Sequence, residues 1–245
     1  MIFEVCFLES SPGIDITFLV LHGHLDVELN DVGRQQAIAV ADRLAEKREI
    51  SAVYISDLKR ARDTAHVIES RCNVHMFWFS NNSLSHSVGA KHTNPIVKKK
   101  PERIEDPEIR ERHLGDLQGF SMREAAKLKV DANKASLSSR ADQEIPGVGE
   151  SFDQHFHRCT SSLQKIGRKH KGQRLAEFTH GGVSKAFHKR AAPTAELPSK
   201  IQNASISIFE IADEEGWTIK AWGEVGHLSN TGFLETAFGG DGNSG

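Results

Sequence analysis

Apolar and polar positions alternate along the chain in patterns that predict strands and helices in turn. Residues 14–21, 52–55 and 175–178 are short, mostly apolar runs, which is typical of buried strands. Between these runs, apolar side chains recur every three or four residues and predict amphipathic helices. Four helices are expected on this ground, beginning at Asn30-Asp31, at Ser56, at Glu150-Ser151 and after Gly182.

The remaining segments show other patterns. Residues 204–225 alternate with period two on both sides of a turn at 214–216, which predicts a hairpin or two adjacent strands. Residues 74–101 keep neither a helical nor a strand period and end in three lysines, so we interpret them as an irregular surface insertion with a solvated basic end. The tail is expected to fray. The chain, 1–245, is therefore predicted to form a single domain.

Strands that alternate with helices predict an α/β fold. The expected architecture is a three-layer, doubly wound, mostly parallel sheet with helices on both faces. In such folds, ligands bind beyond the carboxyl ends of the strands. His22, the turn from Ser56 to Arg60, and His180 all follow predicted strands, so these segments are expected to converge at one edge of the sheet.

Composition narrows the classes of function. The formal net charge of -2 gives no basic field for a nucleic-acid backbone, so an anionic ligand would need local arginines and backbone N–H groups. Three cysteines without regular spacing predict no disulfide framework and a reducing compartment. No apolar run is long enough for a bilayer, and the N-terminus lacks the basic region of a signal peptide. We therefore expect a cytoplasmic protein that binds neither nucleic acid nor membrane.

The predicted strand ends carry residue types suited to phosphoryl transfer without a metal. Such chemistry needs a neutral imidazole as nucleophile, cationic or N–H donors for the phosphoryl oxygens, and an acid for the leaving oxygen. Glycines at 23, 181 and 182 flank His22 and His180, so Gly23 and Gly181 allow the backbone to approach a phosphate closely. A zinc site is not expected, because His155 and His157 lie two positions apart in a predicted helix and face different sides.

Four motifs in order carry a resemblance to a known family. Residues 56–65, SDLKRARDTA, resemble the S-x-L-x-R-A-x-x-T-A motif of the histidine phosphatases, the phosphoglycerate-mutase-like superfamily. Residues 108–119 resemble the segment bearing the general acid of that family, and residues 149–158 and 178–183 complete the set. The resemblance is closest to plant phosphoglycerate-mutase-like phosphatases and covers most of the chain from residue 23, apart from the insertion.

The resemblance implies a role for each matching residue. Arg60 would bind the transferring phosphoryl group, Glu111 would donate a proton to the leaving oxygen, and His180 would stabilise charge beside the phosphoryl group. Arg112 would contact the substrate, a small phosphorylated metabolite. Ser56 and the residue after it would cap a helix rather than touch substrate. The resemblance implies no metal and no other cofactor, and it leaves a monomer and a homodimer open.

The chain departs from the family where the nucleophile is expected. The family begins with a strand ending in R-H-G-E-T and a loop with W-N and a second arginine, whereas this chain reads LVLHGHLDVELNDVG at residues 19–33. In one alignment His22 and Gly23 are the nucleophile pair, and about a dozen residues of phosphate-binding loop are missing. In the other, residues 23–26 continue the end of that loop, and unrelated residues replace the catalytic strand. Losing one charge-assisted donor typically costs about 2.7–4 kcal/mol of transition-state stabilisation.

Three functions therefore stay open. The first is a metal-independent phosphatase that hydrolyses a small phosphate monoester through a phosphohistidine at His22. The second is a catalytically impaired member of the family, acting as a binding protein or present as a non-functional isoform. The third is a phosphoglycerate mutase, against which the missing loop argues. Glu177 is also unusual, because it falls in a strand that the family keeps apolar, and burying an unpaired carboxylate is costly.

Overall fold

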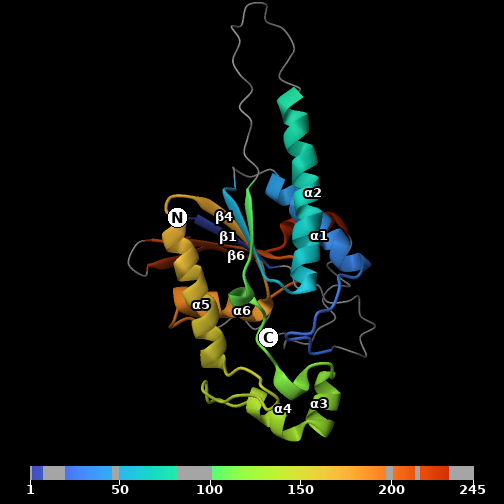
Figure 1. Cartoon of the computed structure of the whole chain (residues 1–245), viewed down its shortest axis with the longest axis vertical. Coiled ribbons are helices and arrows are strands. Elements are labelled where there is room, and N and C mark those ends of the chain that lie inside the picture. The colour runs from blue at the N-terminus through green and yellow to red at the C-terminus, as the bar shows by residue number, and fades with distance from the viewer. Residues whose placement is uncertain are drawn as a thin grey trace, which may run out of the picture.

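The computed structural model describes residues 2–7, 20–45, 50–81, 101–196, 201–212 and 216–231. Its strands are β1 (Ile2–Phe7), β2 (Ala52–Ile55), β3 (Glu102–Glu105), β4 (Arg174–Thr179), β5 (Ile206–Ile211) and β6 (Trp217–Glu224). They form one six-stranded sheet in the order β3-β2-β4-β1-β5-β6 (Figure 1). The first four in this order are parallel, and β5 is antiparallel to both of its neighbours. The predicted mostly parallel sheet and the hairpin are both confirmed.

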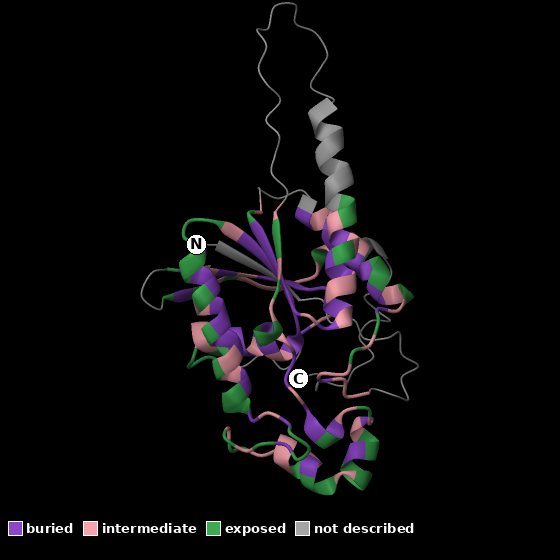
Figure 2. Ribbon diagram, in the orientation of Figure 1, coloured by how far each residue is buried: buried purple, intermediate pink, exposed green. Residues whose placement is uncertain are grey.

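Helices cover both faces of the sheet, as the alternating pattern predicted. Helices α1 (Asp31–Ala45) and α2 (Lys59–Asn81) pack on one face, where Val40 and Ala61 meet Phe178 of β4. Helices α5 (Phe152–Lys169) and α6 (Gly181–Ala191) pack on the other, where Leu163 meets Leu175 of the same strand. Alternate residues of β4 thus face opposite sides of the sheet and pack into two separate apolar cores, as expected for a strand that is buried on both faces. Figure 2 shows the buried residues along the strands and on the sheet-facing sides of these helices.

A smaller helical unit lies at the carboxyl edge of the sheet. It contains α3 (Met122–Leu128), α4 (Val130–Ser136) and the short 3-10 helix Gly115–Leu117. Two further 3-10 helices pack elsewhere, Pro107–Ile109 on α5 and Gly226–Thr231 on α1. Helix α3 begins with a capping box in which Ser121 and Glu124 bind each other's backbone N–H. The small cluster of Leu114, Leu117 and Ala125 holds this unit together. None of the helices in the described ranges is long and apolar enough to cross a membrane.

The N-terminal part of the chain differs from the prediction. Residues 20–21 belong to no strand, since Val20 forms only an isolated bridge with Ser121, and residues 14–19 lie outside the described residues. The strand that occupies the sheet between β4 and β5 is instead β1, in which Phe7 pairs with Thr179. A central strand needs an extended run with partners on both sides, and periodicity alone does not tell which of two apolar runs takes that place.

Two further boundaries differ from the sequence-based expectation. Helix α2 continues to Asn81, so the beginning of the predicted insertion is helical, and no glycine or proline interrupts residues 59–81. The rest of the insertion up to residue 100, with its lysine run, lies outside the described residues, as does the C-terminal tail. Residues 129–149, a largely polar stretch, contain helix α4, which was not among the helices expected from the apolar spacing.

Candidate active site

Parallel strands deliver the candidate residues to one edge of the sheet. Ser56 follows β2, Glu111 lies in the loop after β3, and His180 follows β4 directly. Their elements are held side by side, because Ser56 N donates to Phe178 O at 2.9 Å and Thr179 Oγ1 donates to Ile109 O at 2.7 Å. The segments that carry Ser56, Glu111 and His180 therefore converge at this edge. His22 follows no strand, contrary to the expectation, and lies in a loop that contacts Arg60.

The loop that carries His22 is tied to the start of α2 through Arg60. The Arg60 side chain is completely buried, and its Nη2 and Nη1 donate to the carbonyl oxygens of Gly23, at 2.9 Å, and Leu25, at 3.0 Å. Asp26 of the same loop accepts from Lys59 N at 2.5 Å and thereby caps the helix. His22 is partly buried, and burial together with the charge of Arg60 lowers its pKa to about 4. Its imidazole is therefore neutral at neutral pH.

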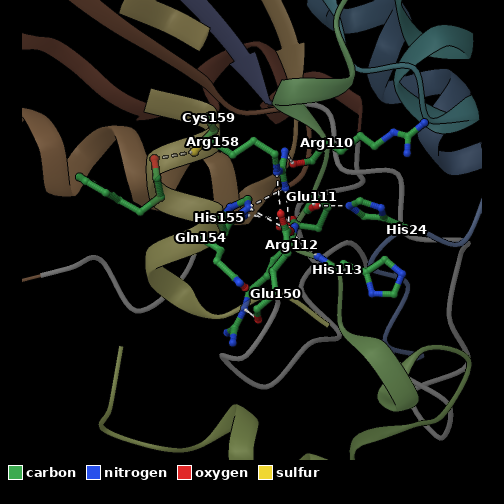
Figure 3. Close-up of polar contacts among 12 residues, drawn as sticks. His24, Arg110, Glu111, Arg112, His113, Glu150, Gln154, His155, Arg158 and Cys159 are labelled. Carbon is green, nitrogen blue, oxygen red and sulfur yellow. Dashed lines mark hydrogen bonds and ion pairs between the residues drawn. The ribbon is translucent and has the colours of Figure 1, made fainter. Parts of the chain in front are cut away.

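Glu111 is buried with both carboxylate oxygens bound by backbone donors. Oε1 accepts from Arg112 N at 2.7 Å, and Oε2 accepts from Gly182 N at 3.0 Å. A side chain at position 182 would collide with Oε1, so glycine is required there. The Glu111 carbonyl accepts from His24 Nε2 at 2.6 Å and from Arg158 Nη2 at 3.2 Å. Figure 3 shows His24 approaching this segment from one side and helix α5 from the other.

His180 caps the start of α6 and has a completely buried side chain. Its Nε2 lies 2.8 Å from Ser56 Oγ, and its Nδ1 has no hydrogen-bond partner in the described part of the chain. Burial, reinforced by the charge of Arg60, holds its pKa well below the usual value. The ring is therefore neutral. Gly181, the first residue of α6, is buried beside it.

Arg112 lies between the loop before α5 and the Phe152 ring. Its Nε donates to Glu150 O at 3.0 Å, and its guanidinium carbon lies 3.8 Å from the centroid of Phe152. Its Nη2 is buried without a hydrogen-bond partner among the described residues. The carboxylate of Glu150 accepts from Arg158 Nε at 2.7 Å and from His113 N at 2.8 Å. Burial raises its pKa, but the hydrogen bonds from Arg158 and His113 and the charge of Arg158 together outweigh that effect and lower the pKa to about 2.

His155 is a buried imidazole that sequence reasoning considered only as a zinc ligand. It lies on α5, and its Nδ1 is 3.0 Å from Arg158 Nη2, which makes Nδ1 an acceptor. Its Nε2 faces the backbone at Gly182. Burial lowers its pKa to about 4. No group of three metal-binding side chains occurs among the described residues.

We expect His155 to make the protein less stable in acid. Because the pKa of His155 is about 4 in the folded chain and about 6.5 when unfolded, the unfolded state binds more protons between these values. Stability from the neutral ring is thus lost as pH falls through this window, by up to about 1.4 kcal/mol per pH unit. Urea unfolding of His155→Leu from pH 7 to 4 should show a shallower decline than the wild type. His157→Leu, exposed on the same helix, should keep the wild-type slope.

Two residues expected to cap α2 have different contacts. Ser56 does accept from Leu58 N, at 3.4 Å, but it also contacts His180. Asp57 forms a bidentate ion pair with Arg110, with both N–O distances at 2.5 Å. No local sequence pattern indicated the contacts of Ser56 with His180 or of Asp57 with Arg110, because the partners lie more than 50 positions apart.

The chain is similar in sequence to known proteins over the segments that contain these motifs. A family model described as the histidine phosphatase superfamily (branch 1) matches residues 18–77 and 84–225. Phosphoglycerate mutase-like protein 4 from Arabidopsis thaliana is 47% identical over 225 residues, which are 92% of this chain and 86% of the relative. A metal-independent phosphoserine phosphatase from the same plant is 40% identical over 221 residues, covering 90% of this chain and 81% of the relative.

Solved structures share the fold at low sequence identity. YhfR from Bacillus stearothermophilus superposes with a TM-score of 0.70 at 22% identity, covering 92% of this chain and 99% of that chain. A mycobacterial glucosyl-3-phosphoglycerate phosphatase superposes with a TM-score of 0.66 at 22% identity, covering 91% and 99%. The three-layer arrangement of helices around the sheet is thus shared with these proteins.

Proposed function

The chain belongs to the histidine phosphatase superfamily (branch 1), and on that premise we propose that it hydrolyses small phosphate monoesters without a metal ion, through a phosphohistidine intermediate. One observation carries the proposal. Two buried nitrogens, Nδ1 of His180 and Nη2 of Arg112, have no hydrogen-bond partner among the described residues. Their residues adjoin Glu111 through the backbone, because Arg112 N and Gly182 N, two residues after His180, donate to its carboxylate. Unsatisfied buried polar groups are costly, and phosphoryl oxygens would satisfy them. The 40% identity to a relative named metal-independent phosphoserine phosphatase supports the same chemistry.

In this proposal the residues divide the work as follows. His22, whose low pKa leaves it neutral at neutral pH, attacks phosphorus. Glu111 gives a proton to the leaving oxygen and, in the second step, takes one from the attacking water. Arg60, Arg112 and His180 stabilise the charge on the phosphoryl oxygens. Gly23 and Gly181 let the backbone come close to the phosphate.

The proposal predicts hydrolysis of p-nitrophenyl phosphate in the presence of EDTA. His22→Ala should abolish turnover, because the phosphohistidine cannot form. His180→Ala should lower kcat by about 10²–10³-fold, as expected for one lost donor to the transition state. His66→Ala, exposed on α2, should match the wild type. Folding of each variant is checked by circular dichroism. A well-folded wild-type chain without activity above background would contradict the proposal, and unchanged activity in His22→Ala would contradict the assigned nucleophile.

A catalytically impaired binding protein is the second candidate, and two observations favour it. The family match begins at residue 18, so β1 lies outside it, and residues 8–21 contain no histidine, arginine or lysine. Arg60 also donates to two carbonyl oxygens of the His22 loop. Calorimetry with orthovanadate distinguishes the two candidates, because binding without any turnover supports the impaired form. An assay with 3-phosphoglycerate in the same series tests mutase activity.

A further inference from the structure

We propose that Ser56 is a positioning residue that fixes the imidazole of His180 with its proton on Nδ1, so that Nδ1 is the donor offered to a bound phosphoryl oxygen. The assignment of the phosphoryl group as the acceptor rests on the proposed function. The assignment of the proton does not, because it follows from contacts within the chain. Ser56 therefore acts through His180, beyond the helix-capping role that its motif suggests.

The geometry of the pair is set by the sheet. Ser56 and His180 follow the neighbouring parallel strands β2 and β4, in which Ile55 pairs with Phe178. The bond from Ser56 N to Phe178 O, at 2.9 Å, extends this ladder by one step. Both side chains are completely buried, and Ser56 Oγ lies 2.8 Å from Nε2 of His180. Because strand pairing fixes the two backbones, the short side chain of Ser56 is held at a constant position relative to the His180 ring.

The hydrogen-bond donors and acceptors around His180 favour one tautomer of its ring. Ser56 Oγ accepts from Leu58 N at 3.4 Å, so its own hydrogen remains to be donated. If that hydrogen goes to Nε2 of His180, the ring proton is on Nδ1, and Nδ1–H is the single unsatisfied group. If Nε2 instead carries the proton, both the hydroxyl hydrogen and the Nδ1 lone pair lack partners. Leaving one buried group unsatisfied costs less than leaving two.

The surroundings of the ring favour an anion at Nδ1. The groups whose charges act most strongly on His180 are Arg60, His24, His155 and Arg158, all basic. They disfavour a second proton on the ring, and burial acts in the same direction, so His180 contributes as a neutral donor. A neutral, buried N–H near the guanidinium groups of Arg60 and Arg158 is a good donor to a phosphoryl oxygen, because these two charges attract the ligand and the N–H orients it.

Imidazole ¹⁵N NMR tests the tautomer directly in the wild-type chain. The signals of His180 are assigned by their loss in His180→Gln, and protonated and unprotonated ring nitrogens are distinguished by their shifts. We expect Nδ1 to be protonated and Nε2 to be unprotonated. A ring with the proton on Nε2, or an even mixture of both forms, would overturn the proposal whether or not the protein is active.

Substitutions then test whether Ser56 causes the preference. Ser56→Ala should produce a mixture of tautomers and weaken orthovanadate binding about tenfold, as expected for the loss of one well-oriented hydrogen bond. Ser56→Cys, which keeps a weak donor, should fall between the two. The matched control is Ser184→Ala. Ser184 is equally buried but donates to the main-chain oxygen of His180, at 3.3 Å, so the tautomer should not change.

The outcomes separate this inference from the proposed function. A wild-type chain that neither turns over substrate nor binds vanadate refutes the phosphatase while leaving the tautomer measurement intact. A change of tautomer in Ser184→Ala equal to that in Ser56→Ala would show a general loosening of the site and overturn the specific role of Ser56. Retention of a pure Nδ1–H form in Ser56→Ala would do the same.

Discussion

Glu111→Gln is expected to lower kcat for alkyl phosphate esters by about 10²–10⁴-fold, the usual contribution of a general acid. The carboxyl group is the proton source for the leaving oxygen, and an amide of the same shape supplies none. Glutamine also presents an NH₂ group to one of two backbone donors, Arg112 N or Gly182 N, where the carboxylate accepts from both. Both effects reduce the rate in the same direction.

The dependence on the leaving group identifies the cause of this loss. A nitrophenolate leaves readily without a proton, so kcat for p-nitrophenyl phosphate should fall much less than kcat for phosphoserine or glycerol phosphate. The control Glu108→Gln lies three residues earlier on an exposed side chain and should be indistinguishable from the wild type. Equal losses for good and poor leaving groups would show that Glu111 supports the structure of the site rather than proton transfer.

Glu177→Val is expected to stabilise the protein by about 1–3 kcal/mol, the typical cost of an unsatisfied buried polar group. Glu177 lies on the central strand β4 and is 1% exposed, and neither carboxyl oxygen has a hydrogen-bond partner in the described part of the chain. The same face of β4 packs on the apolar core of α5 and α6 through Leu175. Valine suits a buried strand, and Tm should rise by roughly 2–4 °C per kcal/mol in a chain of this size.

The benefit of Glu177→Val should grow with pH. Burial raises the pKa of Glu177 well above its usual value, and the negative charge of Asp106 adds to this effect. The folded chain therefore keeps the proton at pH values where the unfolded chain has released it, so wild-type stability falls as pH rises from about 4.3 towards the folded pKa. The slope is at most about 1.4 kcal/mol per pH unit.

Urea unfolding of the wild type, Glu177→Val and Glu177→Gln between pH 5 and pH 8 measures this effect. Both variants lack the titrating group, so their stability should not show the decline assigned to Glu177. Glutamine keeps the shape and polarity and should stabilise less than valine at pH 5. Parallel curves for all three proteins would mean that Glu177 has found a partner or does not titrate in this range.

Much of the candidate site could be read from the sequence because its signals are local. Arg60, Glu111 and His180 each lie in a short motif, and each motif follows a strand or the loop after one. Parallel strands bring such positions to one edge whatever the details of packing. The same logic predicted the helices on both faces, since their apolar spacing repeats within one helix.

Residues that act through distant partners could not be found in this way. His24 binds the carbonyl of Glu111 across 87 positions, and Ser56 reaches His180 across 124. His155 lies within the motif at residues 149–158, but that motif assigned it no role, and only its burial against α6 makes it part of the site. From the residues next to them in the sequence, such polar side chains are predicted to be exposed to solvent. Their burial and their hydrogen-bond partners are seen only in the folded structure.

The sequence by itself determined the family, the α/β architecture and the chemical types at the strand ends, because these depend on short motifs and on periodicity within single elements. Only the tertiary structure decided that residues 2–7 form the strand next to β4, that Arg60 holds the His22 loop, and that Glu177 is buried without a described partner. The physical reason is that strand pairing, burial and hydrogen-bond satisfaction depend on contacts between segments far apart in the chain.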